Sequence, residues 1–128
     1  MPLKILTVDD SRIVRSMVTR ALKNYDCVIV EAADGKLGLE AAARENPDVI
    51  LLDVTMPVMD GFEMLAQLRN HPTLHATPVV MLTAESSQEN LARADQLGVS
   101  GYIPKPFKED QILEKIRKAV PLEPKPAA

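Results

Sequence analysis

The chain has 128 residues, of which 46% are hydrophobic and 26% are charged, and its formal net charge is −3. These values are ordinary for one soluble globular domain with a sizeable core, and the negative charge balance argues against a nucleic-acid-binding role for the domain alone. No segment approaches the about 18 consecutive apolar residues of a transmembrane helix, and no signal-peptide pattern opens the chain, so no membrane insertion is expected.

Short apolar runs, typical of buried strands, alternate with stretches whose apolar residues recur at helical spacing. Strands are expected at Leu3–Val8, Cys27–Ala32, Val49–Leu52, Val79–Leu82 and Gly101–Ile103. Helices are expected at Arg12–Lys23, Lys36–Glu45, from after Asp60 to about Arg69, Ser87–Leu97 and Glu109–Val120. Five strand–helix pairs in strict alternation with short connections predict an α/β fold, a doubly wound parallel sheet with helices on both faces.

Several residues mark the ends and faces of these elements. Ser11 and Asp60 are expected to cap helix N-termini, and Gly98 a helix C-terminus in the left-handed conformation. In the first helix, two rows form the expected apolar face: Ile13, Met17, Ala21 and Val14, Val18, Leu22. The Pro-rich segment Leu122–Ala128 is expected to be disordered. The single Cys27 is expected to be a buried thiol; it excludes an internal disulfide and fits a reducing cytoplasm.

Polar residues follow the predicted strands directly. Asp9 and Asp10 follow the first strand, Asp53 the third and Thr83 the fourth, and Lys105 comes shortly after the fifth. Carboxyl ends of parallel strands meet at one edge of a sheet, so three carboxylates are expected in one crevice if the first and third strands are neighbours. Hard oxygen ligands without His or Cys suit Mg²⁺. With a lysine and a threonine hydroxyl for phosphoryl oxygens, the set predicts a phosphoryl acceptor with Asp53 as nucleophile.

Each of these residues also has an ordinary structural interpretation. Asp9 and Asp10 could serve only as helix-capping residues, Asp53 as a turn residue and Thr83 as another cap, while Lys105 could be a solvated charge. The phosphoryl-acceptor hypothesis depends on their joint placement at the ends of consecutive strands. His71 and His75 flank a proline-containing loop, but no further ligand type lies near them in the sequence.

With these positions, the sequence resembles the receiver domain of two-component response regulators, of the small stand-alone chemotaxis type. The likeness lies in Asp9-Asp10, LLDVTMPVMDG, Thr83-Ala84 and YIPKPF, and it covers residues 3–120. It implies a flavodoxin-like sheet with strand order 2-1-3-4-5, a receiver domain over residues 1–120 and a short Pro-rich tail over residues 121–128.

The resemblance also implies roles for particular residues. Asp53 would accept a phosphoryl group from a phosphohistidine on a sensor histidine kinase or a phosphotransfer protein. Mg²⁺ would be held by Asp10 and Asp53, by the backbone carbonyl of Thr55, and by Asp9 largely through water. Lys105 would pair with the phosphoryl group.

Three further positions follow from the same likeness. The bond between Lys105 and Pro106 would be a cis peptide. Thr55 and Glu85 occupy positions that tune self-dephosphorylation in the family, so they bear on the lifetime of the phosphorylated state.

A switch mechanism follows from the larger, dianionic group that phosphorylation creates. Thr83 can swing in to hydrogen-bond a new phosphoryl oxygen, and the vacated space lets the ring of Tyr102 turn inward. The expected output surface, which would contact a downstream protein, is formed by Ser87–Leu97, Gly101–Ile103 and Glu109–Val120. Such a chain would catalyse only its own phosphorylation and dephosphorylation.

Three other interpretations stay open. A Mg²⁺-dependent phosphatase with an aspartyl-phosphate generally needs a second Asp two residues after the nucleophile, and position 55 is Thr. A degenerate receiver that binds a partner without phosphate would not need Asp9, Asp10, Asp53, Thr83 and Lys105 together. A receiver excised from a longer protein would look the same, with the Pro-rich tail as the start of a linker.

Overall fold

The computed structural model describes residues 2–83 and 88–126, which form a parallel sheet enclosed by helices. The strands are β1 (Leu3–Val8), β2 (Cys27–Ala32), β3 (Val49–Asp53), β4 (Val79–Thr83) and β5 (Gly101–Pro104). The helices are α1 (Arg12–Ala21), α2 (Gly35–Glu45), α3 (Gly61–Arg69), α4 (Gln88–Gln96) and α5 (Glu109–Ala119). The strand order is β2-β1-β3-β4-β5, and every pairing is parallel, as the sequence predicts.

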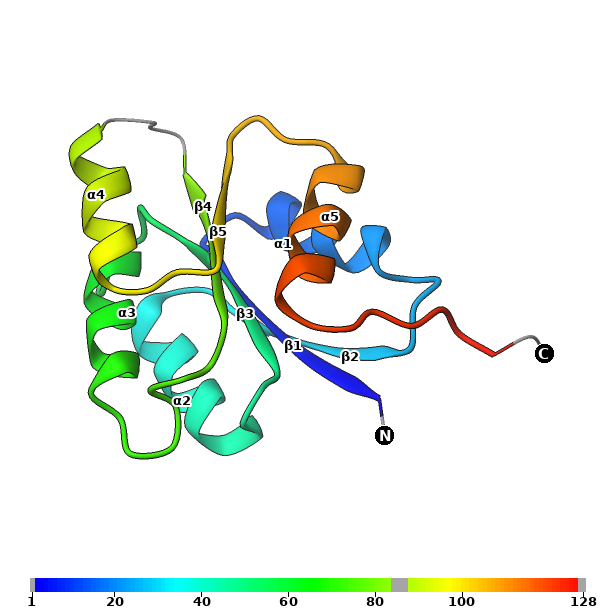
Figure 1. Ribbon diagram of the computed structural model, residues 1–128, viewed down its shortest axis with the longest axis horizontal. Coiled ribbons are helices and arrows are strands. Elements are labelled where there is room, and N and C mark those ends of the chain that lie inside the picture. Colours follow the sequence, from blue (N-terminus) through cyan, green and yellow to red (C-terminus); the bar gives the residue numbers. More distant parts are fainter. Residues whose placement is uncertain (1, 84–87, 127–128) are drawn as a thin grey trace.

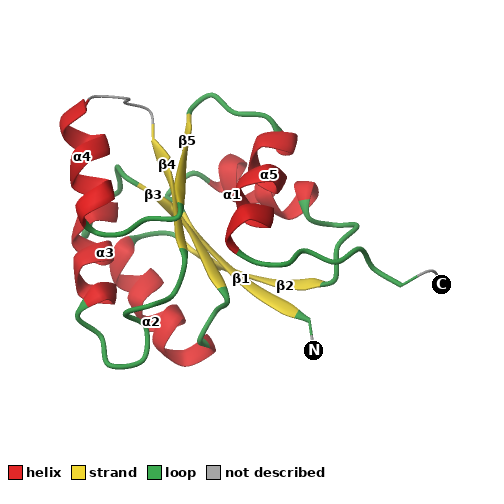
Figure 2. Cartoon of the chain, in the orientation of Figure 1, coloured by secondary structure: helices red, strands yellow, loops and turns green. Residues whose placement is uncertain are grey.

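The helices divide into two layers around the sheet (Figures 1 and 2). Helices α1 and α5 cover one face, and α2, α3 and α4 cover the other. The central strand β3 contributes side chains to the hydrophobic core on each face of the sheet. Ile50 and Leu52 pack toward α2 and α3, whereas Val49 and Leu51 pack toward α1 and α5. A strand buried on both faces must be apolar at consecutive positions, which explains why this run is continuous rather than alternating.

Two helices that start near the carboxyl ends of the strands have side-chain hydrogen bonds that cap their N-termini. The Ser11 hydroxyl accepts a hydrogen bond from the Val14 N–H (3.3 Å), and the Asp60 carboxylate accepts one from the Glu63 N–H (2.9 Å). Gly98, with φ of +70°, follows α4 in the left-handed conformation. These three predicted helix ends are confirmed. The caps fix where each chain segment leaves the sheet edge, and therefore where the polar residues at that edge lie.

Element boundaries differ from the predictions by one or two residues. Helix α1 ends at Ala21 rather than Lys23, because the Leu22 N–H is shared between the Val18 and Thr19 carbonyls as the helix tightens. Helix α5 ends at Ala119. The predicted helix start at Ser87 lies outside the described residues.

The predicted apolar face of α1 is wrong at one position. Ile13 is 80% exposed, although Val18 and Ala21 are buried and Met17 packs against the core. Ile13 belongs to the first turn of the helix, where it lines a surface groove with Ser16 and Arg20 instead of reaching the sheet.

The predicted disorder of the C-terminal tail is wrong for its described part. The Asp26 N–H donates to the Glu123 carbonyl (2.8 Å), and the Lys125 N–H donates to the Asn24 carbonyl (2.9 Å). These hydrogen bonds form an antiparallel bridge beside Tyr25 and tie the tail to the turn between α1 and β2. Among the described residues, no helix is long and apolar enough to cross a membrane.

Candidate functional site

Three carboxylates meet at the edge where β1 and β3 end. The two strands are neighbours, with Val8 paired to Leu52, so the residues that follow them share one crevice. Asp9 is fully buried, Asp53 is 3% exposed and Asp10 is exposed. One oxygen from each of the three carboxylates lies within 4.8 Å of the others. The structure therefore brings these acidic residues together as the sequence predicts.

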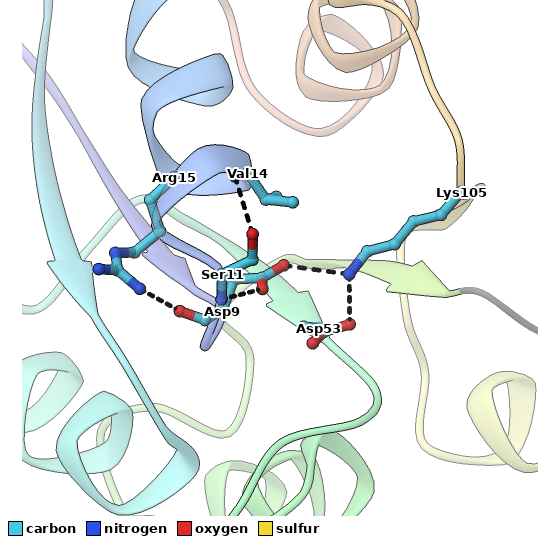
Figure 3. A network of polar contacts seen from close by, with 6 residues as sticks. All are labelled: Asp9, Ser11, Val14, Arg15, Asp53 and Lys105. Atoms are coloured by element: carbon cyan, nitrogen blue, oxygen red, sulfur yellow. Dashed lines mark hydrogen bonds and ion pairs between the residues drawn. The ribbon is translucent and has the colours of Figure 1, made fainter.

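Lys105 supplies a positive charge to this crevice from the loop after β5. Its Nζ donates to Asp53 Oδ1 (2.9 Å) and to Asp9 Oδ2 (3.3 Å), as Figure 3 shows. Its backbone N–H donates to the Thr83 carbonyl (2.7 Å), and the peptide bond from Lys105 to Pro106 is cis. The ammonium group is thus anchored between two buried carboxylates, although β5 is two strands away from β3.

The Asp9 carboxylate is held in one orientation by partners on both of its oxygens. Oδ1 accepts from the Ser11 N–H (2.8 Å), and Oδ2 accepts from Lys105. The backbone carbonyl of Asp9 accepts from Arg15 Nη1 (2.6 Å), and Arg15 Nε pairs with Glu31 (3.0 Å). Figure 3 shows the contacts of Asp9 with Ser11, Arg15 and Lys105. Sequence analysis missed the role of Arg15; its position four residues after Ser11, on the same side of α1, was the available signal.

Burial, hydrogen bonds and charges in the crevice shift the pKa values of Asp53 and Lys105. Burial raises the pKa of Asp53, the negative charges of Asp9 and Asp10 raise it further, and the hydrogen bond from Lys105 opposes the rise. Burial pushes the pKa of Lys105 down, but the hydrogen bond and charge of Asp53, together with Asp9, outweigh burial and raise it. The ammonium group therefore stays protonated among three carboxylates. A site with this excess of negative charge and only hard oxygen donors could hold a divalent metal ion.

Two glycines set the path of the loop that leads from β3 to α3. A Cβ on Gly61 would lie 2.2 Å from the Asp53 carbonyl oxygen, and a Cβ on Gly35 would lie 2.5 Å from the Met59 carbonyl oxygen. The loop is hydrogen-bonded at both points, from the Gly61 N–H to Val54 (2.8 Å) and from the Gly35 N–H to Met59 (3.2 Å). Each glycine is the first residue of a helix and follows the aspartate that caps that helix, but its close approach to the loop is visible only in the structure.

Three other residues of this loop, Thr55, Pro57 and Val58, lie at the surface, whereas Met56 is buried in the core. The side chain of Thr55 is exposed. Val58 is 76% exposed and has φ of +69°, which is uncommon for a β-branched residue. These exposed residues lie within a few positions of Asp53 in the sequence.

Thr83 and Tyr102 lie on neighbouring strands beside the crevice. Thr83 ends β4, one residue beyond Leu82, which is paired with Asp53. Thr83 is 5% exposed, whereas Tyr102 is half-buried on β5 and donates its hydroxyl hydrogen to Asp95 Oδ1 (3.1 Å). Both side chains line the same narrow cavity under α4. Glu85 lies outside the described residues.

Comparison with known proteins agrees with this geometry. The family model described as the response regulator receiver domain matches residues 5–117. Protein PilG of Pseudomonas aeruginosa is 32% identical over 119 residues, which are 93% of this chain and 88% of PilG. Response regulator MprA of Mycolicibacterium vanbaalenii is 38% identical over 117 residues, 91% of this chain and 50% of MprA, so the chain spans about half the length of that relative.

Solved structures of response regulators have the same fold as this chain. The chemotaxis protein CheY4 of Vibrio cholerae superposes with a TM-score of 0.88 at 36% identity, covering 94% of this chain and 100% of that structure. Three observations support the same family: the receiver-domain match, the strand order β2-β1-β3-β4-β5, and the convergence of Asp9, Asp10 and Asp53. The chain therefore belongs to the response regulator receiver domain family of two-component systems, with its flavodoxin-like fold.

Proposed function

We propose that the protein is a phosphorylation-dependent switch in which Asp53 accepts a phosphoryl group from a phosphohistidine on a sensor histidine kinase or phosphotransfer protein in the cytoplasm. One observation carries the proposal: the buried Asp53 carboxylate contacts Lys105 Nζ at 2.9 Å and lies within 4.8 Å of two further carboxylates. Three acidic groups with one ammonium group make a strained charge arrangement for a purely structural site, but a suitable one for a metal ion and a phosphoryl group.

Mg²⁺ fits the donors that the crevice offers. Asp10, Asp53 and the backbone carbonyl of Thr55 would hold the ion directly, and Asp9 would contribute largely through water. When bound, Mg²⁺ neutralises carboxylate charge and the charge of the phosphoryl oxygens. The exposure of Asp10 and Thr55 means that an ion can enter from solvent without opening the core.

The residues of the chain itself prepare Asp53 for the transfer. A carboxylate oxygen of Asp53 forms the new bond to phosphorus while the bond from phosphorus to the donor imidazole breaks. The imidazole leaves with the bonding electron pair. Lys105 already donates to Asp53, so its ammonium group can contact a phosphoryl oxygen with little movement. The hydrogen bonds on both oxygens of Asp9 keep that carboxylate fixed during the reaction.

The chain acts as a regulator of other proteins rather than as an enzyme with an external substrate. Phosphorylation draws the Thr83 hydroxyl toward a phosphoryl oxygen, and the ring of Tyr102 turns toward the space that Thr83 leaves. The packing of α4, β5 and α5 changes as a result, and this face contacts the downstream protein. The Vibrio cholerae relative is a chemotaxis protein, which fits an output through protein contact.

Phosphorylation by a small donor tests the proposal. The protein is incubated with Mg²⁺ and acetyl phosphate, and the phosphate that is labile to acid and base is mapped by mass spectrometry. We expect one phosphate, on Asp53, and none on the Asp53→Asn variant. Gln96→Ala, which changes an exposed side chain of α4, is the matched control and should be labelled like the wild type. A label on any other residue, or no label, would contradict the proposal.

A further inference from the structure

The hydroxyl of Tyr102 has a specific partner on the neighbouring helix. Tyr102 lies on the edge strand β5, and its hydroxyl donates to Asp95 Oδ1 of α4 at 3.1 Å. Burial and the Asp95 carboxylate both raise the pKa of Tyr102, so the hydroxyl keeps the hydrogen that it donates. A charged acceptor makes this a stronger bond than one to a neutral group. The ring is therefore held in an outward position by a contact that does not involve the acidic crevice.

The space beneath the ring is too small to receive it. The cavity between α4 and the sheet has a volume of about 10 Å³, which is room for about one water molecule at most and far less than a phenol ring needs. It is lined by Val54, Phe62, Met81, Thr83, Asn90, Leu91, Ala94 and Tyr102. A phenol ring enters this space only if a lining side chain moves. Inward rotation of Tyr102 thus requires two events, the creation of space and the loss of the bond to Asp95.

The end of α4 that carries Asp95 is fixed to the rest of the protein. Arg69, at the end of α3, donates to the carbonyls of Leu97 (2.7 Å) and Gly98 (3.1 Å), and also to the carbonyl of Thr77 (2.9 Å). One turn earlier, the Arg93 guanidinium lies 4.4 Å from the centre of the Phe62 ring of α3. Because these contacts flank Asp95 on both sides, its carboxylate cannot easily follow a moving ring. The hydrogen bond must break when Tyr102 turns.

We propose that Asp95 is a positioning residue that holds Tyr102 in its outward position and thereby sets how readily the protein switches. The inference rests on the proposed function, since it concerns the same switch, but the hydrogen bond itself exists without phosphate. Loss of the Asp95 carboxylate shifts the equilibrium of the unphosphorylated protein toward the inward ring. A hydrogen bond worth about 1 kcal/mol corresponds to an about fivefold change in that equilibrium.

NMR of the two tyrosine rings tests this proposal in the unphosphorylated full chain without added metal. Tyr25, the other tyrosine, serves as the internal reference. In Asp95→Ala, we expect the pKa of Tyr102 to fall toward its ordinary value and the minor inward population, measured by relaxation dispersion, to rise about fivefold. Asp95→Asn keeps a neutral acceptor and should show a smaller rise. Gln96→Ala should leave both quantities unchanged.

A double-mutant cycle separates the hydrogen bond from a general loosening of α4. In a Tyr102→Phe background the hydroxyl is absent, so Asp95→Ala should no longer change the ring population. A population within twofold of wild type in Asp95→Ala would overturn the proposal. An equal rise in Gln96→Ala, or a full rise in the Tyr102→Phe background, would also overturn it.

The outcomes distinguish this inference from the proposed function. Normal phosphate labelling of Asp53 in Asp95→Ala, with no change at Tyr102, would refute the role of Asp95 and leave the phosphoryl-acceptor assignment standing. Absence of label on wild-type Asp53, with a fivefold change at Tyr102 in Asp95→Ala, would refute the proposed function and support the hydrogen-bond assignment.

Discussion

Gly61 packs closely against the backbone of Asp53 and Val54. Replacing Gly61 should therefore displace the acceptor Asp53 while leaving its carboxylate chemically unchanged. In Gly61→Ala, the new Cβ would lie 2.2 Å from the Asp53 carbonyl oxygen and 2.9 Å from Val54 Cα. Ordinary contact begins near 3.4 Å, so these groups must separate by about 1.2 Å. The clash is with backbone atoms on both sides, and no change of rotamer relieves it.

The size of this clash sets the expected loss of stability. Overpacking of this kind costs about 1–3 kcal/mol, which lowers the Tm of a domain of this size by about 4–12 °C. Because the shift displaces the backbone that carries Asp53, and a misplacement of about 1 Å can cost about 100-fold in rate, phosphorylation should fall far more than stability alone explains. Circular dichroism melting and the initial rate of labelling by acetyl phosphate measure the two effects.

Two other glycines serve as matched controls. Gly98→Ala places a side chain at φ of +70° with its nearest heavy atom, of Arg69, 4.0 Å away, so it should lower Tm but spare the labelling rate. Gly101→Ala meets only the flexible Lys115 side chain at 3.4 Å and should change little. The reasoning is refuted if Gly61→Ala melts and reacts like the wild type, or if it loses no more rate than Gly98→Ala at an equal loss of stability.

Further predictions concern charge and the tail. Because the pKa of Asp53 is raised, its ionisation destabilises the folded state, so without metal Asp53→Asn should melt above wild type at pH 7. That difference should shrink as pH falls through the raised pKa and vanish below the ordinary value of 3.8; a lower Tm at pH 7 would contradict it. Lys105→Met removes the ammonium group that forms ion pairs with two buried carboxylates and should lower the free energy of unfolding by about 2 kcal/mol or more, with melts showing that Mg²⁺ stabilises this variant more than wild type. An equal Mg²⁺ effect in both would argue against the shared site. Truncation after Val120 removes two backbone hydrogen bonds and should cost about 1–2 kcal/mol in urea unfolding without changing the labelling of Asp53; an unchanged urea midpoint would show that the tail contributes nothing.

The acidic site could be predicted because strand polarity fixes it. An apolar run that ends on a carboxylate places that group at the carboxyl edge of a parallel sheet, and the pairing of β1 with β3 then brings Asp9 next to Asp53. The structure lengthens three strands by one residue, to Asp53, Thr83 and Pro104. The backbone hydrogen bonds between β3 and β4 continue past the apolar runs, since the Val54 N–H donates to the Leu82 carbonyl (3.0 Å). Such backbone bonds cannot be predicted from the polarity of the side chains.

The exposure of Ile13, the docking of the tail and the contact of Tyr102 depend on how elements pack in space, which the sequence pattern does not reveal. Helical spacing correctly groups Ile13 with Met17, but it does not say how far along α1 the sheet extends, and so Ile13 is exposed. The tail is held by backbone groups of Asn24 and Asp26 about a hundred residues away in sequence, and no side-chain pattern encodes those partners. The contact of Tyr102 with Asp95 likewise depends on how α4 packs beside β5.

Isothermal titration with Mg²⁺ tests most directly whether Asp9, Asp10 and Asp53 converge to form a metal site beside the acceptor. We predict one ion per chain in the wild type, with affinity strongly reduced in both Asp10→Asn and Asp53→Asn and unchanged in Gln96→Ala. No binding to the wild type, or equal affinity in the wild type and Asp53→Asn, would contradict the central claim.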